Sequence, residues 1–213
     1  VDVGLAALQR LGCRLDKTPS KLRNLLKLMQ TRLAIRSKSF TDLHALPAMT
    51  DRRQLEIMEL LGLLLPPAYW TYPDLLAQVV FQMVRDTLTH GYSPNAGYGL
   101  SWWGITESAL LDNIDSGVVF GDFAIELAKK HGLRLQQPLF FVGWIVLKYK
   151  HHLRKTLPLL QQAYAISLEK GDFEYASYAR NNEMQARFHC GTPLAELLPE
   201  MSLAHRDLTR FQL

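Results

Sequence analysis

Apolar residues recur every three or four positions along almost the whole chain. After Pro73 this spacing is kept by Leu75, Leu76, Val79, Val80, Met83, Val84 and Leu88, and after Pro19 by Leu22, Leu25, Leu26, Met29 and Leu33. Such spacing places side chains on one stripe of an α-helix. No segment keeps the two-residue alternation of a half-buried strand. The sequence therefore predicts an all-α fold.

Start and stop signals divide the chain into helices of ordinary length. Ser93-Pro94 and Thr192-Pro193 place a capping hydroxyl before a proline. Glycines that can end a helix follow the periodic runs at Gly91, Gly132, Gly171 and Gly191. These signals predict roughly ten helices, at 1–11, 20–36, 51–65, 74–90, 94–112, 116–131, 136–151, 154–170, 173–190 and 193–208. Because most links are short, neighbouring helices should run antiparallel.

An internal repeat supports this arrangement. When Gly132 is superimposed on Gly171, 39 positions later, Ala124 falls on Ala163 and Leu127 on Ile166. Helix pairs that repeat about every 34 to 47 residues are typical of α-solenoids. We therefore expect an α-solenoid of antiparallel helical hairpins, a tetratricopeptide-like superhelix. Residues 1–72 should form basic helices and a Pro/aromatic corner, and residues 73–213 one continuous stack.

Charge and composition narrow the classes of partner. The chain of 213 residues has a net charge of +4, but residues 1–53 hold eleven Lys and Arg against four Asp and Glu. This basic end is either a solvated face or a contact for an acidic partner. No nucleic-acid-binding motif occurs, so we expect no nucleic-acid partner.

Apolar runs and cysteines indicate the compartment. No apolar run approaches the roughly 20 residues of a membrane span, so none is expected. Cys13 and Cys190 lie far apart and belong to no CxxC motif. We expect reduced thiols and a cytoplasmic location.

Common catalytic motifs are absent. The sequence contains no GxxxxGK[ST], GxSxG or HExxH and no kinase catalytic loop. We therefore expect no catalytic residue, no cofactor and no metal in this chain. One alternative stays open, in which Glu107, Asp112 and Asp115 act as acids in a cleft instead of as helix-end charges.

Three clusters are candidates for binding. The first, a wall of a ligand or partner groove, comprises Tyr98, Trp102, Trp103, Trp144 and Tyr149; its alternative is packing between hairpins. The second, an anion contact, comprises Lys148, Lys150, His151, Arg154 and Lys155; its alternative is a favourable interaction with a helix C-terminus. The third is the aromatic segment Pro66–Pro73, either a packed corner or a docking site.

Several short segments, in this order, carry a family resemblance. They are Leu46–Asp51 (LPAMTD), Leu65–Tyr69 (LPPAY), Met83-Val84, Gly91–Pro94 (GYSP), Leu157–Leu160 (LPLL) and Leu168–Ala176 (LEKGDFEYA). Together they resemble the helical middle region of very large bacterial signalling proteins. These combine a serine/threonine-kinase-like domain, an AAA-type ATPase, a GAF domain and a histidine kinase; fungal hybrid histidine kinases contain similar chains. The chain departs from the family at Lys148-Tyr149 and His152, where a His-Trp pair and a proline are usual.

The resemblance implies a sensor between an ATPase switch and an output kinase of a two-component system. The expected partners are a protein, a peptide or a small-molecule inducer, and the neighbouring domains of the same polypeptide. The full-length protein is then an ATP-dependent serine/threonine kinase, a histidine kinase or both, while this segment has no activity of its own. The alternative is a passive scaffold or a homodimerisation segment.

Overall fold

The computed structural model describes residues 1–210, with all their side chains except those of Phe40, His205 and residues 207–210. The described part of the chain contains eleven α-helices and no β-strand, which confirms the all-α prediction. The helices are α1 (Asp2–Arg10), α2 (Lys21–Arg36), α3 (Phe40–His44), α4 (Arg52–Thr71), α5 (Pro73–His90), α6 (Ala96–Ile105), α7 (Ile114–His131), α8 (Gln136–Trp144), α9 (Leu157–Glu169), α10 (Phe173–His189) and α11 (Leu194–Arg210). Three shorter turns join them: a π-helix η1 (Thr106–Leu110) and the 3₁₀ turns η2 (Val146–Tyr149) and η3 (Leu153–Lys155).

The chain forms two compact units, Val1–Trp103 (unit 1) and Gly104–Leu213 (unit 2). The sequence predicted a division at residues 72 and 73, at the end of the aromatic segment. The difference arises because α5 packs against both α4 and α2 and so belongs with the helices that precede it.

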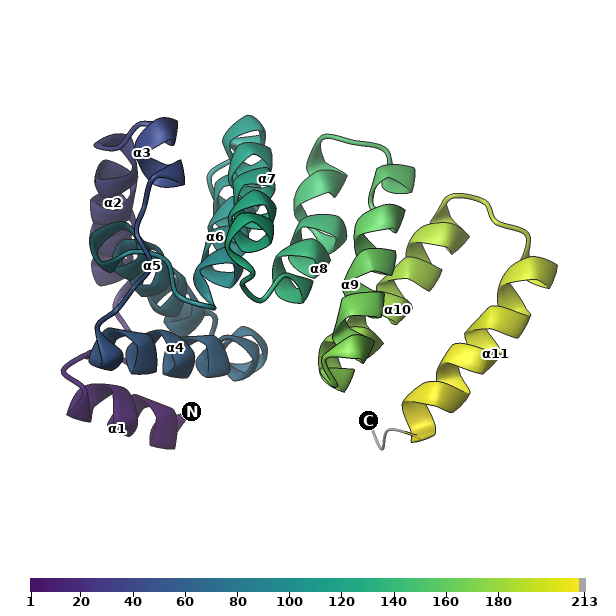
Figure 1. The fold of residues 1–213 in the computed structure, drawn as a ribbon, viewed down its shortest axis with the longest axis horizontal. Helices are drawn as coiled ribbons and strands as arrows, with labels where there is room; N and C mark the ends of the chain where they lie inside the picture. Colours follow the sequence, from purple (N-terminus) through teal and green to yellow (C-terminus); the bar gives the residue numbers. More distant parts are fainter. Residues whose placement is uncertain (211–213) are drawn as a thin grey trace. The chain divides into compact units, whose positions relative to one another are not determined.

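Unit 1 is built on the helical pair α4 and α5 (Figure 1). The carboxylate of Asp51 caps α4 by accepting a hydrogen bond from the Gln54 amide at 3.2 Å. The two helices bury their apolar stripes completely at Leu61, Leu65, Leu75 and Met83. Helix α2 packs on α5 and α1 packs on α4.

Helix α4 continues through the two prolines that were expected to end it. Its last residue is Thr71, not Leu65, so Pro66 and Pro67 lie inside the helix. A proline inside a helix has no amide hydrogen, so the carbonyl four residues earlier loses its hydrogen bond. The carbonyls affected here are those of Gly62 and Leu63. Leu63 is 65% exposed, so that face of α4 is open to water, which can replace a lost bond. The Pro/aromatic segment is therefore mainly helix instead of a loop.

Two segments that carry the family resemblance lie side by side in unit 1. The amide of Met49 donates to the carbonyl of Tyr92 and the amide of Tyr92 to that of Pro47, both at 2.9 Å. Gly91 enters this bridge with φ of 96° and ψ of −177°, a conformation open almost only to glycine. A Cβ atom at Gly91 would lie 2.2 Å from the carbonyl oxygen of Pro47.

We predict that Gly91→Ala lowers the free energy of unfolding by about 3 kcal/mol, since it adds a clash with backbone to an unfavourable φ. Gly132→Ala is the matched control, because Gly132 also has a positive φ, of 61°, but nothing lies within 4 Å of its Cβ position. It should cost only about 1 kcal/mol. Urea denaturation followed by circular dichroism measures both; equal losses would contradict the role assigned to Gly91.

In unit 2, helices α7 to α11 lie side by side in chain order (Figure 1). Each contacts its neighbours in sequence, and α8 also contacts α10. The repeat positions Ala124 and Ala163 are fully buried, and Gly132 and Gly171 both have a left-handed φ, of 61° and 69°. The 39-residue spacing thus relates equivalent places at the ends of α7 and α9.

Two predicted helices of this region are interrupted. The predicted helix 94–112 becomes α6 followed by η1, and the amide of Leu111, just after η1, donates to the Thr106 carbonyl at 3.2 Å. The predicted helix 136–151 ends at Trp144, because Ile145 has φ of −119° and ψ of −60°. After this break the side chain of Val146 is fully buried and lies next to Gly121 of α7.

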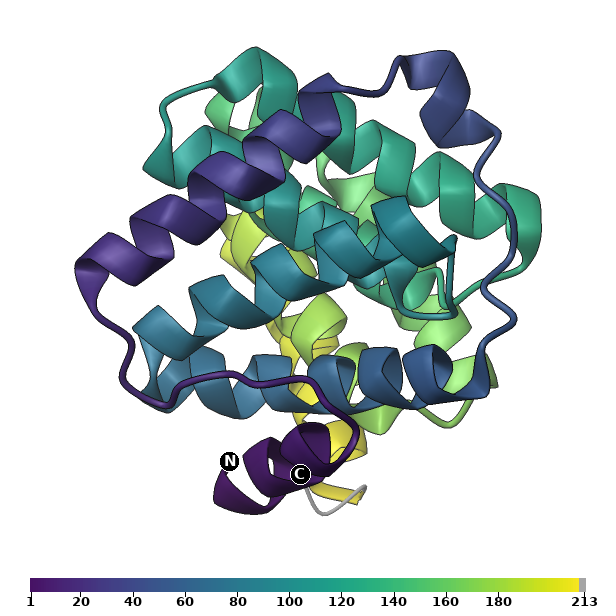
Figure 2. The same ribbon diagram turned by 90° about the vertical axis from the view of Figure 1, so that its left-hand side faces the viewer.

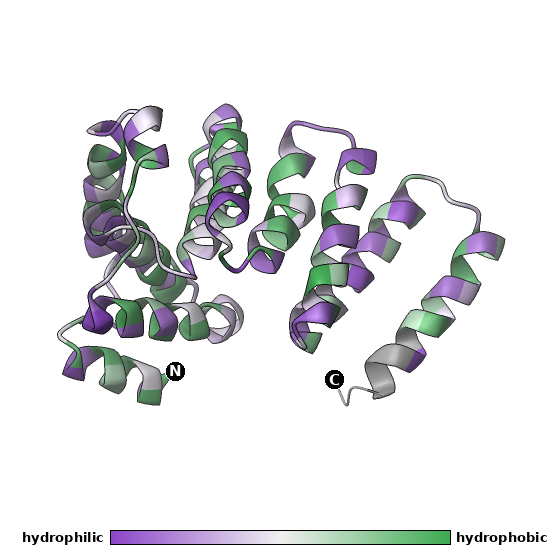
Figure 3. Cartoon of the chain, viewed as in Figure 1, coloured by the Kyte–Doolittle hydropathy of each residue, from purple (hydrophilic) through white to green (hydrophobic). Residues whose placement is uncertain are grey.

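Hydropathy varies around each helix instead of gathering in one long segment (Figure 3). Among the described residues, no helix combines the length and the apolar character that crossing a membrane requires.

Candidate interaction surfaces

The five aromatic residues predicted to line a groove fall into two groups. Tyr98, Trp102 and Trp103 belong to unit 1, where each is at most 5% exposed. Trp103 packs edge-on against Phe81, with ring centroids 6.1 Å apart. These three rings are thus part of the unit 1 core, which corresponds to the packing alternative. Trp144 and Tyr149 belong to unit 2, where Trp144 is half-buried and Tyr149 is 45% exposed.

Trp144 belongs to an aromatic cluster that bridges α8 and α10. The cluster comprises Phe140 and Trp144 of α8 with Tyr175 and Tyr178 of α10. Phe140 stacks on Trp144, with centroids 5.3 Å apart, and on Tyr178, at 5.9 Å. Phe140 and Tyr175 are buried, whereas Trp144 and Tyr178 keep part of their surface in solvent. Half-buried Trp and Tyr rings on a rigid base are typical of residues that dominate binding energy in protein interfaces.

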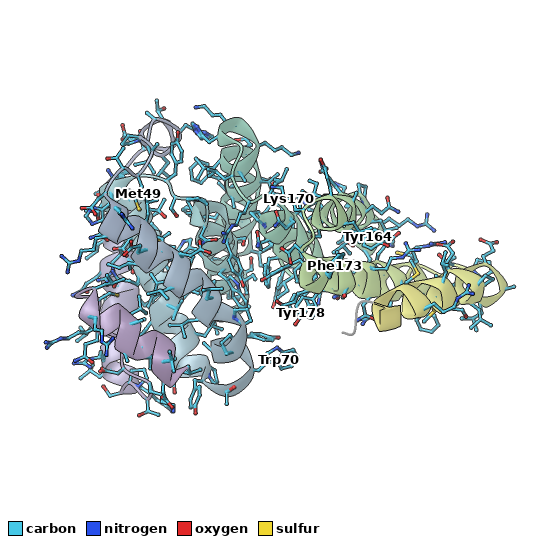
Figure 4. All side chains as sticks on the ribbon, turned by 60° about the horizontal axis from the view of Figure 1, so that its bottom comes forward. Met49, Trp70, Tyr164, Lys170, Phe173 and Tyr178 are labelled. Atoms are coloured by element: carbon cyan, nitrogen blue, oxygen red, sulfur yellow. The ribbon has the colours of Figure 1, made fainter. Side chains whose placement is uncertain are left out.

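The open edge of the cluster carries a hydroxyl. The Tyr178 hydroxyl donates to the Glu174 carboxylate, with 3.1 Å between the oxygens. Burial and the Glu174 charge raise the pKa of Tyr178, so the phenol stays protonated at neutral pH. Figure 4 shows Tyr178 together with Phe173 on α10, and Phe173 is 39% exposed.

A charged network on another face of α10 joins this helix to α9 and was not found from the sequence. Arg180 donates to the carboxylate of Glu183 at 2.7 Å, and its guanidinium lies 5.5 Å from the ring centroid of Tyr164 on α9. Gln161 of α9 donates to the other oxygen of Glu183 at 2.9 Å. Glu183 is only 2% exposed. The spacing of Arg180 and Glu183 could have indicated their pairing within one helix, but the contacts with α9 follow from tertiary packing.

We predict that Arg180→Ala lowers the free energy of unfolding by about 3 kcal/mol, because Glu183 then remains buried without its cation. Adding Glu183→Leu removes the buried charge and should restore at least half of the loss. Arg154→Ala, at an exposed position, serves as control and should change stability by less than about 0.5 kcal/mol. The measurement is urea denaturation; a double variant as unstable as Arg180→Ala would show that the pair is not the source of the loss.

The residues of the predicted anion contact lie in η2, η3 and the link between them. Lys148, Lys150, Arg154 and Lys155 are exposed and His151 is half-buried. Lys150 forms an ion pair with Asp115 in the first turn of α7, which lowers the pKa of Asp115. One of the predicted cations thus already has an anionic partner within unit 2.

The Pro/aromatic segment combines packing with exposure. The ring of Tyr69 lies 5.6 Å from that of Trp102, whereas Trp70 is 74% exposed at the end of α4 (Figure 4). The ring of Tyr69 therefore contacts the unit 1 core on one side, while that of Trp70 is largely open to solvent.

The three acids considered for catalysis have different surroundings. Glu107 is buried in η1 and accepts a hydrogen bond from Asn113 at 2.9 Å. Asp112 is exposed, with φ of 50°, and Asp115 is exposed and paired with Lys150. Among the described side chains, no group of three His, Cys, Asp or Glu residues could hold a metal ion.

Comparison with known proteins places the chain in a signalling context. No family model matches it, and no solved structure matches it significantly. It is 27% identical over 144 residues to the hybrid signal transduction histidine kinase G of Dictyostelium discoideum. The matched segment is 65% of this chain but only 4% of that protein. The chain therefore corresponds to a small part of its relative.

Proposed function

We propose that this chain is a non-catalytic recognition segment of a multidomain signal-transduction protein, and that the aromatic cluster of unit 2 binds a peptide segment of a partner. The cluster carries the proposal, because it presents half-buried Trp144 and Tyr178 on the buried base of Phe140 and Tyr175. The similarity to a signal-transducing histidine kinase supports the signalling role.

The position of the cluster suggests how binding is relayed. Phe140 belongs to the hairpin that begins with α7, and Tyr178 to the hairpin of α9 and α10. A ligand that contacts both hairpins stabilises one relative arrangement of them, and by population shift it favours the neighbouring-domain states compatible with that arrangement. We propose that ATPase and kinase domains of the same polypeptide respond in this way.

Photocrosslinking tests the proposed surface. The photoreactive residue benzoylphenylalanine is placed at position 178, instead of Tyr178, in the full-length protein in its own cells. The control carries it at position 188 instead of Phe188, an exposed aromatic residue of the same helix. We expect a defined adduct from position 178 and none from position 188. The purified partner peptide should then bind the chain, and Tyr178→Ala should weaken binding about tenfold or more.

Further variants separate stacking from other effects. Tyr178→Phe keeps the ring on Phe140 and should retain most of the affinity, while Phe188→Ala should leave it unchanged. Identical adducts from both sites, or equal affinity of Tyr178→Ala and the natural chain, would contradict the proposal. An adduct with a small-molecule inducer instead of a peptide would change the ligand class.

A second candidate function, homodimerisation as a scaffold, is favoured by one observation. Leu194, Leu198 and Met201 share a face of α11 and are 63%, 64% and 45% exposed. Light scattering of the chain and of Leu198→Glu separates the two functions, since a dimer dissociated by this substitution supports assembly.

A further inference from the structure

Helix α2 of unit 1 turns its apolar side outward. Leu22, Leu25, Leu26, Met29 and Leu33 are between 52% and 65% exposed, and Thr31 is the one fully buried residue among the side chains of α2. The sequence predicted these five apolar residues as a stripe, which ordinarily faces a core. Figure 2 shows α2 crossing the front of unit 1, with no other helix of that unit covering its outer side.

The inner side of α2 carries Leu28 and Ile35, which are half-buried, together with polar residues that are held by specific hydrogen bonds. Asn24 donates to the carbonyl of Asp74 at 3.0 Å, and the ammonium of Lys27 donates to the side-chain oxygen of Gln78, also at 3.0 Å. Gln78 is fully buried and donates in turn to the carbonyl of Asp16 at 2.9 Å. Arg85 of α5 donates to Gln30 at 3.3 Å. Rotating α2 to bury its leucines would break these bonds, so its orientation is fixed by unit 1.

The surroundings of Lys27 on this side are partly desolvated. Burial is the main cause that lowers the pKa of Lys27, with the charges of Arg85 and Arg23 adding to it. Cys13, whose pKa burial raises to about 11, and Asp86, whose pKa burial also raises, lie in the same region. The side of α2 that carries Asn24, Lys27 and Thr31 is therefore turned toward unit 1, and the five-residue stripe faces water.

Charge indicates what covers the outer face. Residues 17–41 contain seven Lys and Arg and no Asp or Glu. Successive residues of a helix are rotated by about 100°, so the apolar stripe covers about 100° of the circumference of α2. Lys21 and Arg32 lie along one edge of the stripe and Arg23 lies beyond the other edge. Arg36 lies at the C-terminal end of the stripe. Arg23 is paired with Asp16. A second copy of α2 would oppose these cations with its own, which disfavours a homodimer through this face.

A membrane surface fits the face less well than a protein helix does. Helices that lie on membranes insert Leu, Phe or Trp and are commonly anchored by aromatic residues at the membrane interface, but α2 contains no aromatic residue. Its apolar residues at 22, 25, 26, 29 and 33 have the spacing by which one helix packs along another. Methionine, here at the centre of the stripe, adapts its shape to a partner surface.

We propose that the outer face of α2 is a docking site for an acidic amphipathic helix of a partner protein. The partner's apolar residues cover Leu22, Leu25, Leu26, Met29 and Leu33, and its Asp and Glu side chains lie beside Lys21 and Arg36. This site lies in unit 1 and is independent of the function proposed for unit 2.

A designed peptide tests the site on the full 213-residue chain. The probe is about 18 residues long, carries Leu at helical i, i+3, i+4 and i+7 spacing, and has Glu on its flanks. One control peptide has the same composition with the leucines scattered, and another replaces Glu with Lys. Fluorescence anisotropy at about 0.15 M salt should give a dissociation constant in the micromolar range for the probe, and constants about tenfold or more weaker for both controls.

Variants of the chain locate the binding. The double substitution Leu25→Glu and Met29→Glu should weaken probe binding about tenfold or more, and Lys21→Glu should weaken it several-fold and reduce its dependence on salt. Leu63→Glu, at a residue of α4 that is 65% exposed, is the matched control and should bind as the natural chain does. All these positions are exposed, so circular dichroism should show unchanged melting.

Three results would overturn the proposal. One is probe binding that is equal in the natural chain and in the Leu25→Glu, Met29→Glu variant. Another is no probe binding together with sedimentation on vesicles of phosphatidylcholine and about 30% phosphatidylserine, which would identify a membrane surface. The third is no probe binding together with a dimer, detected by light scattering, that the double substitution dissociates.

Discussion

Contact between helices that are neighbours in sequence is the interaction on which unit 2 depends. Each helix of unit 2 from α7 to α11 packs on the next, and small residues such as Ala124, Ala163 and Gly143 occupy buried positions in these contacts. Such local contacts hold an array together without a central core. They commit one side of each helix to its neighbours, and the other side remains available for side chains such as Trp144 and Tyr178.

Periodicity predicted the existence of the helices well, because it reports directly which residues share a face. It does not report what covers that face. The stripe after Pro73 is buried in unit 1, as its pattern indicated, whereas the equally regular stripe of α2 is exposed. The difference comes from Gln78, whose buried amide binds Lys27 and thereby selects the polar side of α2. A bond between residues 51 positions apart cannot be inferred from local spacing.

Helix ends and candidate sites were less predictable for related reasons. The prolines at 66 and 67 are tolerated because they lie on a partly exposed part of α4, and exposure is a tertiary property. Aromatic composition singled out Tyr98, Trp102 and Trp103, which are buried, but did not distinguish them from Trp144, which is half-buried. The Arg180–Glu183 pair gains its contacts with Tyr164 and Gln161 only when α9 and α10 meet.

Methionine oxidation tests the distribution of buried and exposed faces most directly. The chain has six methionines; Met29 and Met201 are 55% and 45% exposed, while Met49, Met58, Met83 and Met184 are at most 5% exposed. Brief treatment of the native protein with dilute peroxide, followed by peptide mass spectrometry, should oxidise Met29 and Met201 first and leave the other four largely intact until the protein unfolds. Protection of Met29 comparable to that of Met58 would contradict the outward orientation of α2, and rapid oxidation of Met58 or Met83 would contradict the packing of α4 on α5.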